Sequence, residues 1–379
     1  MSSPSPNDQL TGKRADSHEL RALTGIRGVA AVWVVLYHFY PAWLLLVPGL
    51  AFLRLPISRG HFGVDLFFML SGFILCYVYD SSSSQAFGPR EYGKFIWYRV
   101  ARIFPNHLAA LSVLVLLVLG AQAFHVPIEK RNFYHLPYHF TLTQEWPFAP
   151  PGQAAEWVSA SWSLSAEWFA YLFIFPMVAF ILRRKWKPGP SLVVAYALLS
   201  FLLFGFGEIL PYLPFDYNLL EAICEFAAGG LFFGAYRSGG TVAALSRQAA
   251  GGLAMALLVC ICFVALSDRQ IGAIFVLLTP ILLVGLTSEV SWPGWLLSIP
   301  FSLWLGRISY ALYITHTVTE RILKSLLPWD HYKESSLSVR ILVLTANVFA
   351  IFTFALCVHY LVEIPARNYL RRMRPWTVR

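Results

Sequence analysis

Charged residues are scarce in this sequence of 379 residues: 13% are Asp, Glu, Lys or Arg, whereas 57% are hydrophobic. Ordinary soluble domains contain about 25% charged and roughly 45–50% apolar residues. A soluble fold of this length has no core large enough to bury so much apolar surface. The composition therefore excludes a cytosolic enzyme, a secreted disulfide-rich module and a disordered scaffold, and it predicts a polytopic helical membrane protein.

Cysteine is also scarce, and its pattern excludes two further classes. The five cysteines all fall within apolar runs, their number is odd, and the one close pair is a C-x-C within an expected helix. This pattern predicts neither a disulfide framework nor a zinc site, and we expect no metal and no permanently bound cofactor. The net charge of +9 is typical of a basic cytoplasmic face, so we expect no nucleic acid partner.

Long apolar runs dominate what is present. Ten runs approach the roughly 20 residues that a membrane-spanning helix needs, so we predict an all-α protein with about ten transmembrane helices. The spans are expected at roughly 25–43, 61–80, 105–124, 159–182, 190–207, 217–236, 250–267, 271–288, 303–322 and 340–361. The first run is too long for the core of a cleavable signal peptide, so we expect it to act as an uncleaved anchor.

The positions of Lys and Arg predict the orientation. With the N-terminus inside, 20 of the 29 Lys and Arg residues fall on the inner side of the membrane, as the positive-inside rule requires. Both termini are then cytoplasmic in a multi-pass protein of the cell membrane, and lipid surrounds it. We expect a disordered tail at 1–20, a transmembrane domain at 21–365 and a basic tail at 366–379.

The longest outer segment, roughly 125–158, is rich in aromatic residues and histidines. Its tryptophans, Trp146 and Trp157, are typical of an interfacial belt, and stacking on a sugar ring is the alternative. His135 and His139 have the i, i+4 spacing of a metal-binding pair, but no HExxH pattern or third ligand accompanies them.

The first span contains Arg27 and His38, eleven residues apart. Eleven residues make three helical turns plus roughly 20°, so both side chains share one face, about 16 Å apart along the axis. An arginine at the inner end is suited to bind phosphates of an acyl-coenzyme A, and a deeper histidine is suited to act as a general base. In the structural alternative, Arg27 only anchors the helix at the inner face and His38 is a hydrogen-bonded residue of the bundle. The spacing alone does not decide between the catalytic and the structural interpretation.

Other polar residues occur within the expected spans, where they are costly and often mark a functional site. Asp65 is expected at the depth of His38, where it would orient the imidazole, although an acid in the first turn of a helix also interacts well with the helix dipole. Arg99 and Arg102 share a face at the inner rim and suit either phosphate binding or anchoring. Glu167 is expected about 15 Å into the bilayer. An unpaired charge is costly there, so we expect Glu167 to pair with an arginine or histidine or to form a hydrogen bond with an acceptor.

Two further groups of polar residues in the spans give weaker indications of function. Glu221 and Glu225 share one face of the sixth span and are compatible with a proton relay. In the ninth span, Tyr310 or Tyr313 aligns with His316, which we interpret as structural rather than catalytic.

Six ordered motifs resemble membrane acyltransferase family 3. They are Arg27-x10-His38, HFGVDLFFMLSGF at 61–73, R-x-x-R-I-x-P at 99–105, WSLSAEW at 162–168, GRISYALYITH at 306–316 and VEIP at 362–365. The resemblance covers nearly the whole chain. It implies about ten helices and the transfer of an acetyl or other short acyl group from cytoplasmic acyl-CoA to a hydroxyl, typically of an envelope or exported polysaccharide.

The resemblance also implies roles for particular residues. Arg27 and His38 match the essential pair, while Arg99 and Arg102 join donor binding and Glu167 and Tyr310 join the catalytic site. Two departures concern the donor entrance: Tyr98 precedes Arg99 in place of a paired arginine, and Asn106 and His107 replace the usual tyrosine after the proline. Some relatives carry a fused extracytoplasmic esterase-like domain, which we do not see here, so we expect transfer to finish within this chain or on a separate partner.

The sequence therefore predicts a membrane-embedded O-acyltransferase, with His38 as general base, Arg27 holding the donor and a carbohydrate or lipid-linked sugar as acceptor. A small natural product such as a macrolide is an alternative acceptor. A secondary transporter is the rival from another class, although two related halves with broken helices are not visible. A non-catalytic scaffold would not need Arg27 and His38 to be aligned.

Overall fold

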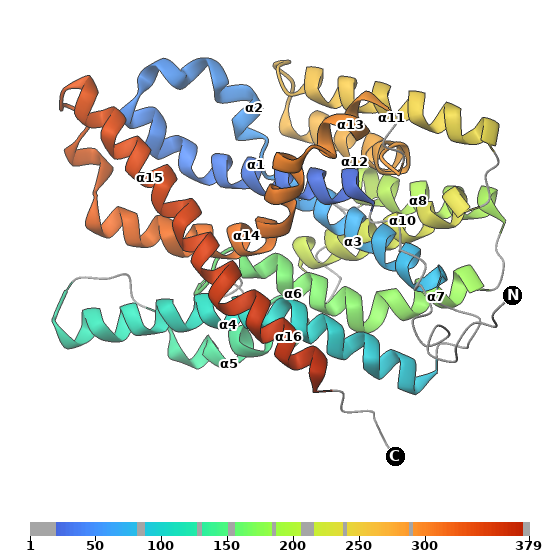
Figure 1. The fold of residues 1–379 in the computed structure, drawn as a ribbon, viewed down its shortest axis with the longest axis horizontal. Coiled ribbons are helices and arrows are strands. Elements are labelled where there is room, and N and C mark those ends of the chain that lie inside the picture. The colour runs from blue at the N-terminus through green and yellow to red at the C-terminus, as the bar shows by residue number, and fades with distance from the viewer. Residues whose placement is uncertain are drawn as a thin grey trace, which may run out of the picture.

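The structure, a computed structural model, describes residues 20–81, 88–126, 131–150, 156–183, 187–205, 216–237, 241–287 and 291–373. Within these ranges all regular secondary structure is helical (Figure 1), which confirms the predicted fold class. The expected N-terminal tail at 1–20 lies, except for its last residue, outside the described residues.

Fifteen α-helices make up the described fold. They are α1 Arg21–Leu46, α2 Arg54–Ser58, α3 Phe62–Ser81, α4 Pro89–Ala123, α5 Leu136–Thr141, α6 Ser161–Phe169, α7 Phe175–Arg183, α8 Pro188–Ser200, α10 Tyr217–Arg237, α11 Thr241–Ile261, α12 Asp268–Gly285, α13 Trp292–Leu297, α14 Pro300–Leu326, α15 Leu337–Val358 and α16 Ile364–Arg372. Short 3₁₀ turns cover Pro48–Leu53, Phe133–His135 and Trp329–His331. Three π-helical turns cover Ala170–Ile174, Phe201–Gly205 and His359–Glu363.

Seven helical stretches among the described residues are long and apolar enough to cross a membrane. They are Arg21–Leu46, Pro48–Tyr79, Pro89–Ala123, Ser161–Arg183, Tyr217–Arg237, Asp268–Gly285 and Leu337–Arg372. Two shorter apolar helices, Pro188–Leu203 and Arg247–Ile261, lie at two other predicted spans. The chain is therefore a polytopic membrane protein, while the total of ten spans and the side of each terminus stay predictions.

The remaining predicted span, 303–322, corresponds to α14, which is long enough to cross a bilayer but carries many polar residues. Most of these side chains are buried rather than exposed, including Ser309, Thr315 and His316. Because α14 packs along α1, α4 and α15, its polar face lies inside the bundle. Polar residues in a transmembrane helix normally face the interior in this way.

Two helices extend well beyond their predicted ends. The third span was predicted to begin at residue 105, but α4 begins at Pro89 and contains Pro105 in its interior. Proline is tolerated in transmembrane helices because neighbouring groups satisfy the freed carbonyl. At the C-terminal end, the helix of α15 continues through His359–Glu363 into α16. Residues 366–372, which were assigned to the tail, are therefore helical.

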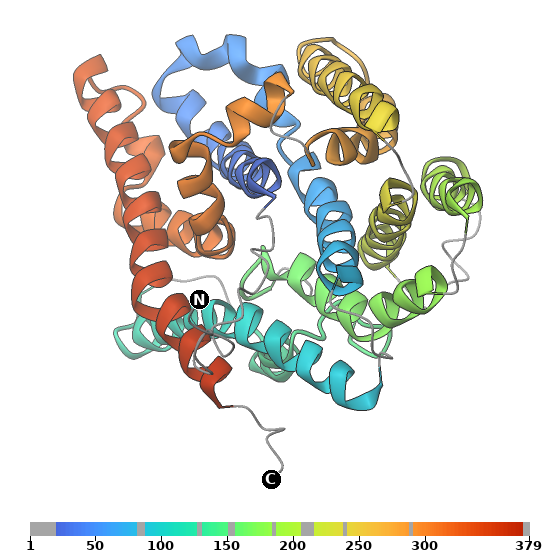
Figure 2. The ribbon, with the colours of Figure 1, turned by 45° about the vertical axis from the view of Figure 1, so that its right-hand side comes forward.

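Helix α1 lies in the middle of the bundle, where it packs against α14, α13 and α3 (Figure 2). The backbones of α1 and α14 approach very closely at Gly28 and Gly306. A Cβ atom on Gly28 would lie 2.5 Å from the Gly306 nitrogen, so a side chain does not fit there. Small residues at such crossings allow close helix packing in membranes, and here they bring the faces of α1 and α14 together.

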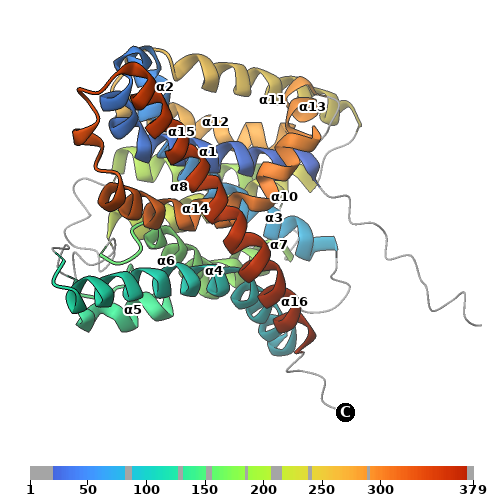
Figure 3. The ribbon, with the colours of Figure 1, turned by 60° about the vertical axis from the view of Figure 1, so that its left-hand side comes forward.

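The remaining helices enclose this centre. Figure 3 shows α11 along one side of the molecule and α4 with α5 along the opposite side, with α15 and α16 crossing between them. Arg59 fixes the segment before α3 to the end of α11: its guanidinium donates to the carbonyls of residues 261, 262, 264 and 266 at 2.7–3.2 Å. Arg59 is only 1% exposed, and these four bonds offset the cost of burying its charge.

Candidate active site

Five of the seven predicted site residues line one cavity of about 110 Å³. Arg27 comes from α1, Arg99 and Arg102 come from α4, Glu167 comes from α6, and Tyr310 comes from α14. These residues are widely separated in the sequence, and only the packing of four helices brings them together. We call this cavity the arginine cavity.

The arginine cavity has an excess of positive charge. Three arginines and a single carboxylate, that of Glu167, line it. The Arg99 guanidinium lies 5.7 Å from the ring centroids of both Phe95 and Tyr171, and the Arg102 guanidinium lies 6.0 Å from the ring of Tyr310. Such stacking holds a guanidinium in place while leaving its N–H edge available for hydrogen bonds to an anion.

Glu167 is already held by two hydroxyl groups. Ser71 donates to its Oε1 at 2.7 Å, and Tyr171 donates to the same oxygen. Tyr171 lies in the π-helical turn Ala170–Ile174 that directly follows α6, and π-helical turns are frequent at functional sites. Among the described residues, no ion pair joins Glu167 to an arginine. Glu167 therefore has hydroxyl partners rather than the cation that was one of the two alternatives expected for it.

Tyr310 is fixed in the wall of this cavity. Its hydroxyl donates to the carbonyl of Ile103 at 2.5 Å, which ties α14 to α4. Because the ring lies beneath Arg102, the hydrogen bond also fixes the surface on which that guanidinium rests.

A second, larger cavity of about 800 Å³ contains the other two predicted residues, His38 and Asp65. Val64 and Tyr313 line both cavities, so the two spaces adjoin at these side chains. The Tyr313 hydroxyl is joined to the Ser163 hydroxyl by a hydrogen bond of 2.6 Å. We call the larger space the histidine chamber.

His38 faces a second histidine within the bundle. The rings of His38 and His316 have centroids 4.8 Å apart. His316 is fully buried, and its Nδ1 lies 2.5 Å from the carbonyl oxygen of Tyr313. Because a carbonyl only accepts, Nδ1 carries a proton and Nε2 of the neutral ring is an acceptor. That Nε2 has no hydrogen-bond partner among the described residues.

Asp65 does not make the predicted contact with His38. Although both line the histidine chamber, no hydrogen bond between them occurs in the part of the chain that the structure describes. Asp65 instead lies beside Glu221 and Glu225 of α10, with carboxylate oxygens within 4.8 Å of one another. The His38 ring instead lies beside the ring of His316, which sequence analysis had interpreted as structural.

Asn106 and His107, which together form one of the two departures from the family pattern, have structural partners. Asn106 donates to Glu363 at 3.1 Å, and Glu363 also accepts from His359 at 2.8 Å and pairs with Arg367 at 3.5 Å. The bonds of Asn106 and Glu363 connect α4 to the π-helical turn His359–Glu363 and to the start of α16.

His107 lies against the outer segment. Its Nε2 bonds to the carbonyl of His139 at 2.6 Å. His135 contacts Glu156 at 2.5 Å. Trp157 is fully buried, and neither of the two roles proposed for an exposed tryptophan applies to it.

Sequence reasoning missed three residues of the site, two that line the cavities and one that lies beside His38. Tyr171 and Tyr313 were not chosen, and His316 was assigned to packing, because a buried aromatic residue at helical spacing is usually a core residue. The available signal was their proximity to chosen residues: Tyr171 follows Glu167 by one helical turn, and Tyr313 and His316 follow Tyr310 by one and nearly two turns.

Comparison with known proteins gives relatives for parts of this chain. It is 33% identical over 148 residues to Nodulation protein 10 of Rhizobium leguminosarum bv. viciae, a match that covers 36% of this chain and 38% of the relative. It is 27% identical over 207 residues to Acyltransferase MdmB of Streptomyces mycarofaciens, covering 52% and 51%. It is 23% identical over 209 residues to O-acetyltransferase OatA of Staphylococcus aureus, covering 52% and 30%.

The matched regions span about half or less of the length of these curated relatives. No solved structure matches the chain. A family model described as an acyltransferase domain matches residues 20–362, which include every residue of the two cavities. The chain therefore belongs to membrane acyltransferase family 3.

Proposed function

We propose that this chain is an O-acyltransferase of the cell membrane that moves an acetyl or other short acyl group from cytoplasmic acyl-CoA to a hydroxyl of a carbohydrate. The observation that carries the proposal is the junction of the two cavities: an arginine-lined cavity adjoins, at Val64 and Tyr313, a chamber that contains His38. Family membership and two relatives, one named an acyltransferase and one an O-acetyltransferase, support acyl transfer as the reaction.

The arginine cavity is suited to the phosphates of the donor. Arg27, Arg99 and Arg102 present forked N–H donors, and the one carboxylate among them already accepts two hydroxyl hydrogen bonds. Charge-assisted hydrogen bonds from arginine to phosphate are among the strongest that proteins make, and they are geometrically specific. The expected inner-side position of these arginines matches a donor that arrives from the cytoplasm.

The distance between the two cavities suits the length of the donor. Arg27 and His38 lie on one continuous helix, α1, eleven residues or about 16 Å apart along its axis. An extended phosphopantetheine arm has a comparable reach. With its phosphates bound at Arg27, the donor would pass Val64 and Tyr313 and present its thioester near His38.

His38 is suited to act as the general base. One of its ring nitrogens removes the proton from the acceptor hydroxyl, and the hydroxyl oxygen forms a bond to the thioester carbonyl carbon. When the C–S bond breaks, the coenzyme A sulfur leaves and receives the proton from the imidazolium. The Nε2 of His316 is an unsatisfied acceptor beside this ring, so we assign His316 the positioning role first expected of Asp65.

Hydroxyl groups at the junction are candidates to stabilise the negative charge on the carbonyl oxygen. Ser163 and Tyr313 share a hydrogen bond and lie where the two cavities meet. A hydrogen-bond donor in a low-dielectric site contributes most when it is already oriented towards the developing charge.

The histidine chamber is large enough for a sugar acceptor. Its volume of about 800 Å³ lies within the range of about 300–1,000 Å³ that is usual for small-molecule sites. Trp162 and Tyr37 provide aromatic faces, and Asn218 and Asp268 provide polar groups around the same space. A carbohydrate has apolar ring faces and many hydroxyl groups, so it binds best where aromatic side chains and hydrogen-bonding groups occur together.

The experiment that tests this function follows the acyl group. Membranes that contain the wild type or the His38→Ala variant at equal abundance are incubated with acetyl-CoA labelled in the acetyl group and with candidate glycan acceptors. We expect base-labile label on an acceptor with the wild type alone. Equal labelling by both proteins would contradict the role of His38.

The choice of acceptor separates the alternatives. Labelling of a glycosylated macrolide but of no polysaccharide or lipid-linked sugar would replace the proposed acceptor class while retaining the reaction. An absence of labelling with all acceptors, together with substrate uptake into proteoliposomes, would support a transporter and overturn the enzyme. If a second, extracytoplasmic protein is required, the acceptor would be labelled only after the extracytoplasmic fraction of the cells is added to the membranes.

A further inference from the structure

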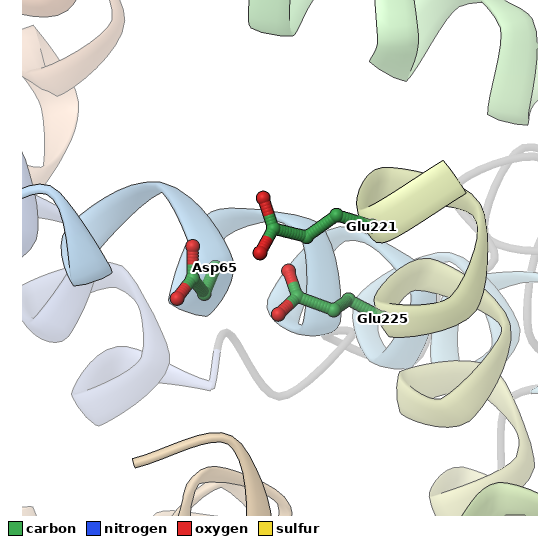
Figure 4. Close-up of side chains that lie close together, drawn as sticks. All are labelled: Asp65, Glu221 and Glu225. Carbon is green, nitrogen blue, oxygen red and sulfur yellow. The ribbon is translucent and has the colours of Figure 1, made fainter. Parts of the chain in front are cut away.

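Three carboxylates meet between α3 and α10, away from the arginine cavity. Asp65 extends from α3, and Glu221 and Glu225 extend from α10 towards it (Figure 4). One oxygen of each carboxylate lies within 4.8 Å of an oxygen of both others. Asp65 and Glu225 are buried and Glu221 is half-buried. We call this group the carboxylate cluster.

Close packing of the two helices holds the cluster together. A Cβ atom on Gly72 of α3 would lie 2.0 Å from the carbonyl oxygen of Phe226, and one on Gly229 of α10 would lie 2.0 Å from that of Met69. Neither position has room for a side chain, so the backbones are in contact one to two turns beyond the carboxylates. The cluster is therefore part of the rigid interior of the bundle and not a chance grouping of mobile surface acids.

Glu225 provides a second and independent observation. It is 0% exposed, and both of its carboxylate oxygens lack a hydrogen-bond partner among the described residues. Its side chain is directed towards Asp65 in the gap between the helices (Figure 4). Within the candidate membrane spans, the buried Glu363 and the half-buried Glu167 are each held by two or more donors. Outside those spans, the buried Glu145 also has no partner for its carboxylate oxygens among the described residues. An unsatisfied buried carboxylate is costly, so the orientation of Glu225 into the gap indicates a missing positive partner.

The protein itself does not provide that partner within the part of the chain that the structure describes. No ion pair there joins Asp65, Glu221 or Glu225 to a basic side chain. The Tyr217 hydroxyl bonds to Glu221, but one hydroxyl does not balance three carboxylates. Charges inside a membrane bundle normally pair with each other or mark an ion pathway or site.

We propose that Asp65, Glu221 and Glu225 bind a divalent metal cation, with Ca²⁺ as the best match. All three ligands are carboxylate oxygens, which Ca²⁺ and Mg²⁺ prefer over the nitrogen and sulfur ligands of transition metals. Ca²⁺ binds oxygen at about 2.3–2.6 Å, so two oxygen ligands on opposite sides of one ion are about 4.6–5.2 Å apart. The carboxylate oxygens of the cluster lie within 4.8 Å of one another, which is close enough for one ion to contact all three.

The histidine chamber gives the cation a route to this site. Asp65 and Glu221 line the chamber, and Tyr217 and Asn218 lie in the same wall. Ca²⁺ takes six to eight oxygen ligands, so water from the chamber would complete a coordination sphere that three carboxylates begin. The bound cation would form part of the wall of the chamber that contains His38. It would also hold α3 to α10, which predicts that the cation stabilises the fold.

The test measures cation binding directly and does not depend on any acyl transfer. The full chain is purified in detergent, stripped with a chelator and titrated with Tb³⁺, a luminescent substitute for Ca²⁺ that nearby tyrosines sensitise. We expect saturable Tb³⁺ luminescence that Ca²⁺ displaces, and a higher midpoint of thermal unfolding in Ca²⁺ than in chelator. In Glu225→Gln, which preserves the side-chain shape, we expect the affinity to fall about tenfold or more, because ligand charge sets the strength of Ca²⁺ sites.

Asp268→Asn is the matched control, because Asp268 also lines the histidine chamber but is not part of the cluster. We expect this variant to bind Tb³⁺ as the wild type does. Unchanged binding in Glu225→Gln, or equal loss in both variants, would overturn the proposal. If Glu225→Gln does not fold, the wild type alone is decisive: no Ca²⁺-displaceable luminescence and equal unfolding midpoints in Ca²⁺ and chelator would mean that protons, rather than a metal, neutralise the cluster.

Discussion

The imidazole rings of His38 and His316 lie 4.8 Å apart, on helices from opposite ends of the chain. The carbonyl of Tyr313 fixes the tautomer of His316, so its free Nε2 is the polar atom available to the neighbouring ring. In the proposed reaction, His38 gains a proton and becomes cationic. An adjacent acceptor would lower the free energy of that state and hold the ring in the productive orientation.

Replacing His316 with glutamine tests this positioning role. We expect the rate of transfer to fall by roughly tenfold to a hundredfold, less than the 10²–10⁴ that general base catalysis contributes at His38. The pH dependence of kcat should also change, since His316 influences the protonation of His38. A His316→Gln variant with reduced abundance but an unchanged kcat and pH profile would show a purely structural role.

Truncated donors test the arginine cavity. S-acetylpantetheine lacks the nucleotide and phosphates of acetyl-CoA, so its use should not depend on Arg27 and Arg102. We expect Arg27→Lys and Arg102→Ala to raise KM for acetyl-CoA by roughly tenfold to a hundredfold, since a charged hydrogen bond contributes about 1.5–3 kcal/mol. The rate with S-acetylpantetheine should stay nearly constant. An equal loss with both donors would mean that these arginines do not bind the phosphates.

The close crossing of α1 and α14 makes a steric prediction. A methyl group on Gly306 would lie 2.0 Å from the carbonyl oxygen of Thr24, so Gly306→Ala should separate the two helices. Overpacking of this kind costs about 1–3 kcal/mol or more. We expect a lower thermal unfolding midpoint and loss of transfer.

Gly120→Ala is the control for that experiment, because a Cβ atom at Gly120 of α4 meets nothing within 4 Å. It should be neutral or slightly stabilising, as alanine is the better helix former. Equal unfolding midpoints for the two variants would show that the crossing is looser than described.

Much of the arginine cavity could be predicted from the sequence because local periodicity places residues on helix faces. Arg99 and Arg102 share one face of a helix, and Arg27 and His38 share another, whatever the tertiary packing. Costly polar residues in apolar runs also marked Glu167 before any fold was known. What these patterns do not contain is which helix faces which.

The carboxylate cluster shows this limit. The sequence placed Glu221 and Glu225 on one face of a helix, but it assigned Asp65 to His38 because the first and second spans are neighbours in the chain. In the structure, the glycines Gly72 and Gly229 pack α3 against α10, and that contact between distant segments directs Asp65 to the glutamates. His316 was likewise beyond prediction, since only the crossing of α1 and α14 brings it to His38.

Glu145 allows a test of stability against pH, because it lies between α5 and α6, outside the candidate membrane spans. Burial, together with the charge of Asp216, raises the pKa of Glu145 from 4.5 to about 7. Between these values the unfolded chain releases the proton while the folded chain keeps it, so folded stability falls as pH rises through this window. Above pH 7 the loss is complete, and below about pH 4 it is absent.

Glu145→Gln removes this loss. We expect the variant to be more stable than the wild type at pH 8, by roughly 2–3 kcal/mol, and nearly equal to it at pH 4.5. Thermal unfolding in detergent at the two pH values measures the difference. The same change in unfolding midpoint at both pH values would show that Glu145 is not a buried, proton-binding carboxylate.

The central claim is that donor binding and acyl transfer are separate tasks, carried out by Arg27 and His38 at the two ends of one helical face. The most direct measurement compares equilibrium binding of labelled acetyl-CoA with transfer to an acceptor in the wild type, Arg27→Ala and His38→Ala. The account predicts that His38→Ala binds the donor like the wild type but transfers at least about 10²-fold more slowly, whereas Arg27→Ala loses donor affinity. Normal transfer by His38→Ala, or donor binding that Arg27→Ala leaves unchanged, would contradict it.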